Sequence, residues 1–130
     1  MILADSSAWI EFLRRTGSRA NVRMRELIED PNQLVVTDAV MMEVMAGGRD
    51  TADEDRLGRL LWGCQFVRTE APADYEDAAA IYRACRRVGY RVGNQLDCLI
   101  AAVAIRTDLP LLHADRDFDA IAAHTPLTVA

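Results

Sequence analysis

The chain has 130 residues, of which 51% are hydrophobic, so we expect one domain over residues 1–130, because this length supports one hydrophobic core and not two. The net charge of −5 argues against nucleic-acid binding through a generally basic surface, although every cationic side chain is an arginine, whose planar guanidinium suits phosphate. No apolar run approaches the roughly 20 residues of a membrane span and no secretory leader pattern opens the chain, so we expect a cytoplasmic protein without a membrane segment.

Short apolar runs alternate with longer helical patterns along the whole chain. Turn residues and helix-capping residues separate them. The predicted strands are residues 1–4, 34–36, 66–67 (weak), 111–113 and, as a fifth, 127–129. The predicted helices begin with one from residue 6, one over 19–29, one ending at 47–48 and one over 51–64. Further along the chain they are one over 73–88, an apolar helix capped by Asn94 and reaching 106, and a short helix over 118–123.

This alternation predicts an α/β domain with a mostly parallel sheet covered by helices on both faces. Ligands of such sheets bind beyond the carboxyl ends of the strands. Acidic residues that directly follow a strand are therefore the candidates for a functional site.

Two acidic residues fit that position, and two more lie in the early turns of helices that could begin at the same edge. Asp5 directly follows the first strand, and Asp115 lies shortly after the strand at 111–113. Glu43 and Asp97 interrupt otherwise apolar helical stretches. We expect all four carboxylates to lie at the same end of the domain.

Four carboxylates in one place repel one another, and a divalent cation relieves that repulsion. Oxygen ligands alone favour a hard ion such as Mg²⁺. Two other interpretations remain open at this point. Asp5 and Asp115 could simply cap the helices that follow them, and arginine partners could neutralise Glu43 and Asp97.

Four segments together resemble the PIN-domain family and, within it, the VapC-type toxins of bacterial toxin-antitoxin pairs. They are Ile-Leu-Ala-Asp-Ser-Ser-Ala-Trp-Ile at 2–10, Glu43 followed by Gly47, Leu-Asp-Cys-Leu-Ile-Ala-Ala at 96–102, and Leu-Leu-His-Ala-Asp-Arg-Asp-Phe at 111–118. The resemblance spans nearly the whole chain. It implies a three-layer α/β/α domain around a mostly parallel sheet of four to five strands.

The resemblance also implies roles for particular residues. Asp5, Glu43, Asp97 and Asp115 would be the catalytic and metal-binding carboxylates, loaded with Mg²⁺ or with Mn²⁺ in its place. The hydroxyl of Ser6 or Ser7 would orient Asp5. Asn94 would also support the site, and Asp117 would be an outer fifth carboxylate. Many relatives carry Arg followed by Ser or Thr where this chain has Gly93-Asn94, which bears on rate and substrate preference more than on reaction type.

The implied activity is that of a toxin endoribonuclease, which hydrolyses RNA phosphodiester bonds with a metal-activated water. The implied partners are a VapB-type antitoxin that blocks the acidic groove and a second copy of the chain in a homodimer. Two alternatives are a catalytically silent PIN-like binding module and a receiver-type signalling domain, which would need a lysine that the chain lacks. A basic stretch at Arg83, Arg86, Arg87 and Arg91 is typical of a solvated helix face, with RNA contact as the alternative.

Overall fold

The computed structural model describes all 130 residues and contains four strands and seven helices. The strands are β1 (Ile2–Ala4), β2 (Leu34–Thr37), β3 (Gln65–Val67) and β4 (Leu111–Leu112). The helices are α1 (Ser6–Leu13), α2 (Arg19–Glu29), α3 (Asp38–Ala46), α4 (Thr51–Trp62), α5 (Ala73–Arg87), α6 (Gln95–Thr107) and α7 (Arg116–His124). None of these helices has the length and hydrophobicity to cross a bilayer.

All strands run parallel in the order β3-β2-β1-β4. Register places Leu3 of β1 between Val35 of β2 and Leu111 of β4. The predicted fifth strand is reduced to a single parallel bridge between Leu111 and Val129. This strand order differs from the 2-1-3-4-5 order of receiver-type domains.

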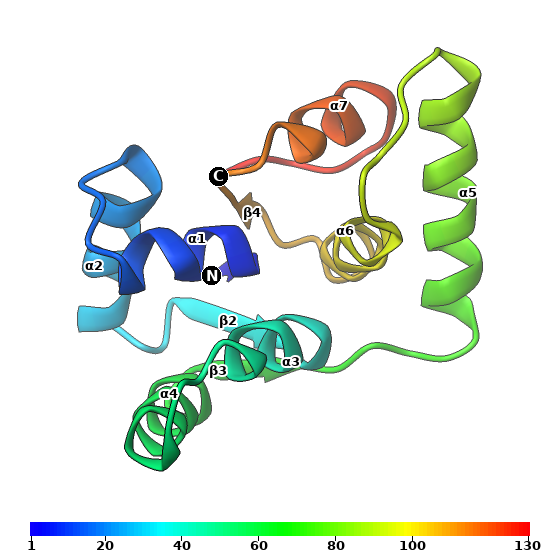
Figure 1. Cartoon of the computed structure of the whole chain (residues 1–130). Coiled ribbons are helices and arrows are strands. Elements are labelled where there is room, and N and C mark those ends of the chain that lie inside the picture. Colours follow the sequence, from blue (N-terminus) through cyan, green and yellow to red (C-terminus); the bar gives the residue numbers. More distant parts are fainter.

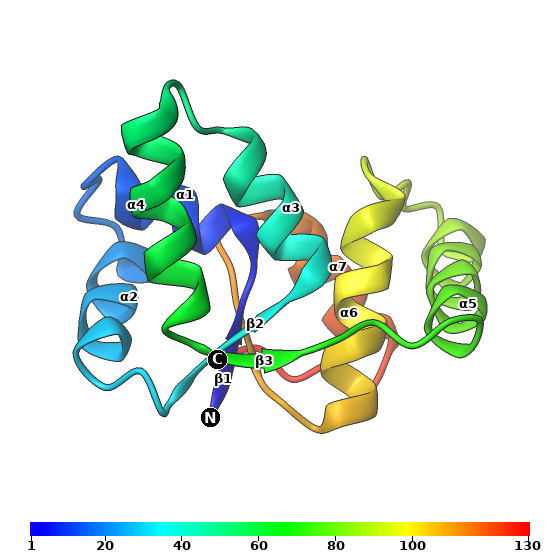
Figure 2. The same ribbon diagram turned by 90° about the horizontal axis from the view of Figure 1, so that it is seen from below.

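Helices cover both faces of the sheet (Figures 1 and 2). Helices α1, α2 and α4 lie on one face, and α6 and α7 lie on the other, with α5 outside α6. Helix α3 leaves the carboxyl end of β2 and lies between the two groups. The predicted three-layer arrangement around a parallel sheet is therefore confirmed.

Helix α6 occupies the most buried position because it lies between the sheet and α5 (Figure 2). Every residue from Asp97 to Ala104 is buried, which explains why its sequence is apolar all round. A helix in this position presents its first turn at the carboxyl end of the sheet. Asp97 lies in that turn and is the only acidic residue there.

A buried ion pair joins α5 to α6. The carboxylate of Asp74 is fully buried and accepts hydrogen bonds from Arg106 Nε and Nη2, each at 2.9 Å to one of its oxygens. Burial opposes ionisation, but these bonds outweigh it and lower the pKa of Asp74. The pair holds α5 along α6 and lies away from the acidic residues at the sheet's carboxyl end.

Candidate metal centre

The fold brings acidic residues from four segments to one edge of the sheet. Asp5 directly follows β1, and Asp115 follows β4, which is the parallel neighbour of β1. Asp97 belongs to the first turn of α6, and Glu43 lies within α3, which begins at the end of β2. Parallel strands end on the same side, so residues far apart in sequence meet there.

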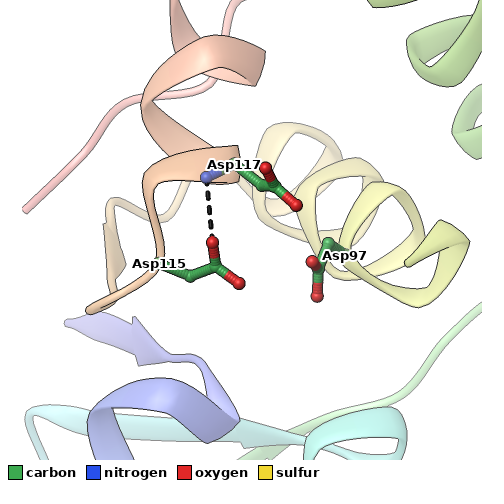
Figure 3. A group of neighbouring side chains, drawn as sticks. All are labelled: Asp97, Asp115 and Asp117. Carbon is green, nitrogen blue, oxygen red and sulfur yellow. Dashed lines mark hydrogen bonds between the residues drawn. The ribbon is translucent and has the colours of Figure 1, made fainter. Parts of the chain in front are cut away.

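Three carboxylates approach one another most closely. One oxygen from each of Asp97, Asp115 and Asp117 lies within 4.8 Å of the other two. Figure 3 shows Asp97 on α6 facing the two aspartates at the start of α7. The sequence had suggested Asp117 only as an outer participant, whereas the structure includes it in this close group.

Asp5 and Glu43 stand beside this group and not within it. Asp5 is 2% exposed and Glu43 is half-buried. Asp5 Oδ1 and Glu43 Oε1 are both buried without a hydrogen-bond partner. A buried oxygen of a carboxylate that lacks any donor is costly, so each is suited to receive a cation.

The charges of these residues act on one another. Burial, followed by the charges of Asp5, Asp115, Glu43 and Asp117, raises the pKa of Asp97 to about 7. Burial is also the largest cause of the raised pKa of Asp5, to which the charge of Asp115 adds. Burial and then the charge of Asp5 raise the pKa of Glu43. All five carboxylates therefore form one electrostatic cluster with Asp97 at its centre.

Helix capping engages only one oxygen of each aspartate that follows a strand. Asp5 Oδ2 accepts the backbone N–H of Ser7 at 2.9 Å and caps α1. Asp115 Oδ1 accepts the N–H of Asp117 at 2.9 Å and caps α7. The capping interpretation is correct for these oxygens, but the second oxygen of each carboxylate stays available for a cation.

The Ser7 hydroxyl joins the ends of β1 and β4. It donates to Asp5 Oδ2 at 2.6 Å and accepts the backbone N–H of Ala114 at 2.9 Å. A hydroxyl with one proton can serve both partners only in this orientation, so Ser7 orients Asp5. Ser6 lies beside Glu43, where its hydroxyl partly offsets the raised pKa of that carboxyl.

Asn94 and His113 hold the backbone around the other carboxylates. Asn94 Oδ1 accepts the N–H of Leu96 at 3.0 Å and caps α6, as the sequence predicted. His113 Nδ1 accepts the N–H of Asp115 at 3.1 Å, and its ring packs against Phe118 with centroids 5.2 Å apart. Both residues act by fixing the helix that carries an aspartate.

Sequence reasoning missed a connection made by Asp117. Its Oδ1 accepts the Tyr90 hydroxyl at 2.5 Å, and its Oδ2 accepts the N–H of Gly93 at 3.0 Å. These bonds tie the loop between α5 and α6 to the start of α7. No local pattern around Tyr90 signals this contact, because the two segments are 27 residues apart in sequence.

No arginine or histidine forms an ion pair with any of the five carboxylates. Arginine neutralisation, the other interpretation left open by the sequence, is therefore excluded for Glu43 and Asp97. An acidic cluster with two unpartnered buried oxygens and no ion pair fits a hard divalent cation. The ligand atoms are all oxygen, which disfavours zinc and other softer metals.

Comparisons with known proteins identify the family of this chain. Residues 2–124 match the model of the PIN domain. Ribonuclease VapC11 from Mycobacterium tuberculosis is 42% identical over 131 residues, an alignment that covers all of this chain and 98% of the relative.

Solved structures share the fold at lower identity. A toxin-antitoxin complex from Klebsiella pneumoniae superposes with a TM-score of 0.71 at 21% identity, over 99% of this chain and all of that chain. VapBC2 from Rickettsia felis, solved with a DNA fragment from its promoter, superposes with a TM-score of 0.72 at 15% identity, over 100% of this chain and 98% of that chain. With a family match over nearly its full length, this chain belongs to the PIN-domain family.

Proposed function

We propose that this protein is a metal-dependent endoribonuclease and the toxin of a toxin-antitoxin pair. The observation that carries the proposal is the meeting of five carboxylates that form no ion pair, two of them with buried oxygens that lack a partner. The 42% identity to a ribonuclease over the whole chain supports RNA as the substrate.

Asp97, Asp115 and Asp117 would hold the cation most closely, with Asp5 and Glu43 completing the site. We propose Mg²⁺ as the ion, with Mn²⁺ able to replace it, because Mg²⁺ binds through few carboxylates together with waters and substrate phosphate. The chemistry supplied at this site would be charge compensation for the phosphodiester and activation of a water molecule as the nucleophile.

The protein's own residues would orient this site. Ser7 holds the Asp5 carboxylate so that Oδ1 stays free, and the cap made by Asn94 fixes the helix turn that carries Asp97. The carboxylates must be ionised to bind the cation, and the raised pKa of Asp97, about 7, makes cation binding weaken as the pH falls below that value. No side-chain nucleophile is needed, so we expect no covalent intermediate.

We further propose that a VapB-type antitoxin binds the protein and blocks the acidic groove. A solved structure of similar fold is described as a toxin-antitoxin complex. We propose homodimerisation as well, since Met42 and Met45 on α3 are 59% and 39% exposed and are suited to an interface. We also propose that the protein acts in the cytoplasm, where an RNA substrate and an antitoxin partner would be available.

The test is cleavage of a labelled RNA by the purified, antitoxin-free protein. We expect cleavage with added Mg²⁺ or Mn²⁺, none with EDTA, and loss of at least a hundredfold in rate for Asp97→Asn. Asp55→Asn is the matched control, because Asp55 is an exposed aspartate on α4 that makes no side-chain hydrogen bond or ion pair. Equal rates for Asp97→Asn and the parent would refute the assignment.

Calorimetric titration with Mn²⁺ distinguishes the enzyme from a silent PIN-like binding module. An enzyme takes up Mn²⁺ at a specific site, and Asp97→Asn weakens that uptake. A protein that neither binds Mn²⁺ nor cuts RNA would instead be such a module.

A further inference from the structure

A cavity of about 640 Å³ opens beside the close group of carboxylates. Its lining combines two of those carboxylates with two arginines, one from the loop between α5 and α6 and one from the first position of α7. The residues that line it are Tyr90, Arg91, Gly93, Asp115, Arg116 and Asp117.

Arg91 and Arg116 are exposed and form no ion pair, although two carboxylates share their cavity. They also make no side-chain hydrogen bond. Elsewhere in the chain, arginines near carboxylates do pair with them, as Arg106 pairs with Asp74 at 2.9 Å. The guanidinium groups beside the carboxylate cluster are therefore free to bind another anion.

Hydrogen bonds of Asp117 and Asp115 restrain the two segments that carry these arginines. The two oxygens of Asp117 accept the hydroxyl of Tyr90, which directly precedes Arg91, and the backbone N–H of Gly93, which lies two residues after Arg91. Arg116 directly precedes Asp117 and follows Asp115, whose side chain caps the same helix. The Asp117 carboxylate thus restrains the loop that carries Arg91, and the Asp115 carboxylate caps the helix that begins with Arg116, so both arginines line the same cavity.

RNA approaching this site carries negative charge into an acidic cluster. A bound cation offsets the repulsion only at the phosphate it touches, so the flanking phosphates need a positive partner of their own. A guanidinium provides a planar pair of N–H donors that matches a phosphate.

We infer that Arg91 and Arg116 bind the phosphates of single-stranded RNA next to the bond that is cut, and so direct the strand across the carboxylate cluster. This assignment rests on the proposed ribonuclease function and adds substrate-binding residues to it. Within the basic stretch identified from the sequence, we assign Arg91 to RNA contact. Arg83 and Arg86 line a separate cavity between α5 and α6.

The experiment measures RNA binding separately from cleavage. Arg91→Gln, Arg116→Gln and the double variant are made in the Asp97→Asn protein, which leaves the RNA intact. Fluorescence anisotropy with a short labelled single-stranded RNA then gives the affinity at several salt concentrations, with Mg²⁺ present. The matched control is Arg14→Gln with Arg25→Gln in the same Asp97→Asn protein, which also takes the net charge from −4 to −6 but alters two exposed, unpaired arginines, one directly after α1 and one on α2.

We expect about tenfold weaker RNA binding for each single variant, since each loses a hydrogen bond to a charged group. The slope of log affinity against log salt should become shallower by about 0.7 per arginine, the value for one phosphate contact on a single strand. Arg116→Lys should keep the parent's slope but bind more weakly, because it keeps the charge and loses the planar fork. The control should keep both the affinity and the slope.

Two readouts separate this inference from general damage and from the proposed function. Mn²⁺ affinity of the arginine variants, measured without the Asp97 change, should equal or exceed that of the parent, because positive charge near the cation has been removed. If the parent cuts RNA but the double variant binds RNA with unchanged affinity and slope, the inference is wrong and the ribonuclease proposal stands. An equal loss in the control variant would also overturn it.

Discussion

Replacing Asp97 by asparagine should stabilise the protein when no metal is bound. The side chain of Asp97 makes no hydrogen bond that asparagine would lose, and burial and four neighbouring carboxylates raise its pKa from 3.8 to about 7. A raised pKa means that the folded state holds a proton which the unfolded state has already released. Asp97 therefore lowers the stability of the parent as the pH rises from about 4 to about 7.

The size of the change in the free energy of unfolding follows from the difference between the two pKa values of Asp97. At about 1.4 kcal/mol per pKa unit, a change from 3.8 to about 7 corresponds to about 4 kcal/mol. The cluster adjoins an open cavity and its carboxylates titrate together, so solvent screening reduces the expected effect to roughly 2 kcal/mol. Asp97→Asn should gain this amount at about pH 8 and almost nothing at about pH 4.

Urea denaturation in EDTA, followed by circular dichroism at both pH values, measures the difference. Saturating Mn²⁺ should reverse the order of stability, because a cation at a hundred times its Kd stabilises the parent by about 2.7 kcal/mol and the variant much less. A variant that is less stable than the parent at about pH 8 without metal would refute the reasoning. So would a difference that does not shrink toward about pH 4.

Three further substitutions test individual contacts. Ser7→Ala should weaken Mn²⁺ binding by about tenfold or more in calorimetry, because Asp5 loses the hydroxyl that orients it; unchanged affinity would contradict that role. Tyr90→Phe should lower the free energy of unfolding by about 1–2 kcal/mol through loss of its bond to Asp117, and a change below a few tenths would count against this bond. Asp74→Asn should cost about 3–5 kcal/mol in urea denaturation because it leaves its arginine partner unpaired, yet Mn²⁺ affinity should be retained. A loss of Mn²⁺ binding in that folded variant would show that the α5–α6 ion pair shapes the site.

Local pattern was sufficient to predict most of the secondary structure. The helix over 19–29 and the order of strands and helices follow from apolar spacing and capping residues. The differences arise where tertiary contacts set the ends of elements. Helix α7 begins at Arg116 and not at 118 because Asp115 caps it, and the fifth strand shrinks to one bridge at Val129.

The candidate site was predictable in composition but not in geometry. Asp5, Glu43, Asp97 and Asp115 were identifiable because each follows a strand or interrupts an apolar helix. Asp117 lies closer to Asp97 than expected. This proximity depends on the orientation of α7 relative to α6, which no local pattern encodes. The metal-binding and catalytic roles of the four carboxylates stay predictions until the experiments above are done.

The sequence by itself determined which residues could bind a cation and which segments form strands and helices. These properties depend on the spacing of apolar residues and on helix caps, which involve only a few neighbouring residues. Only the tertiary structure decided which oxygens are used for capping, which stay free, and which arginines remain unpaired beside them. Those outcomes depend on angstrom-scale distances between side chains on different elements. Such distances are set by how the helices pack on the sheet, and packing depends on the whole core at once.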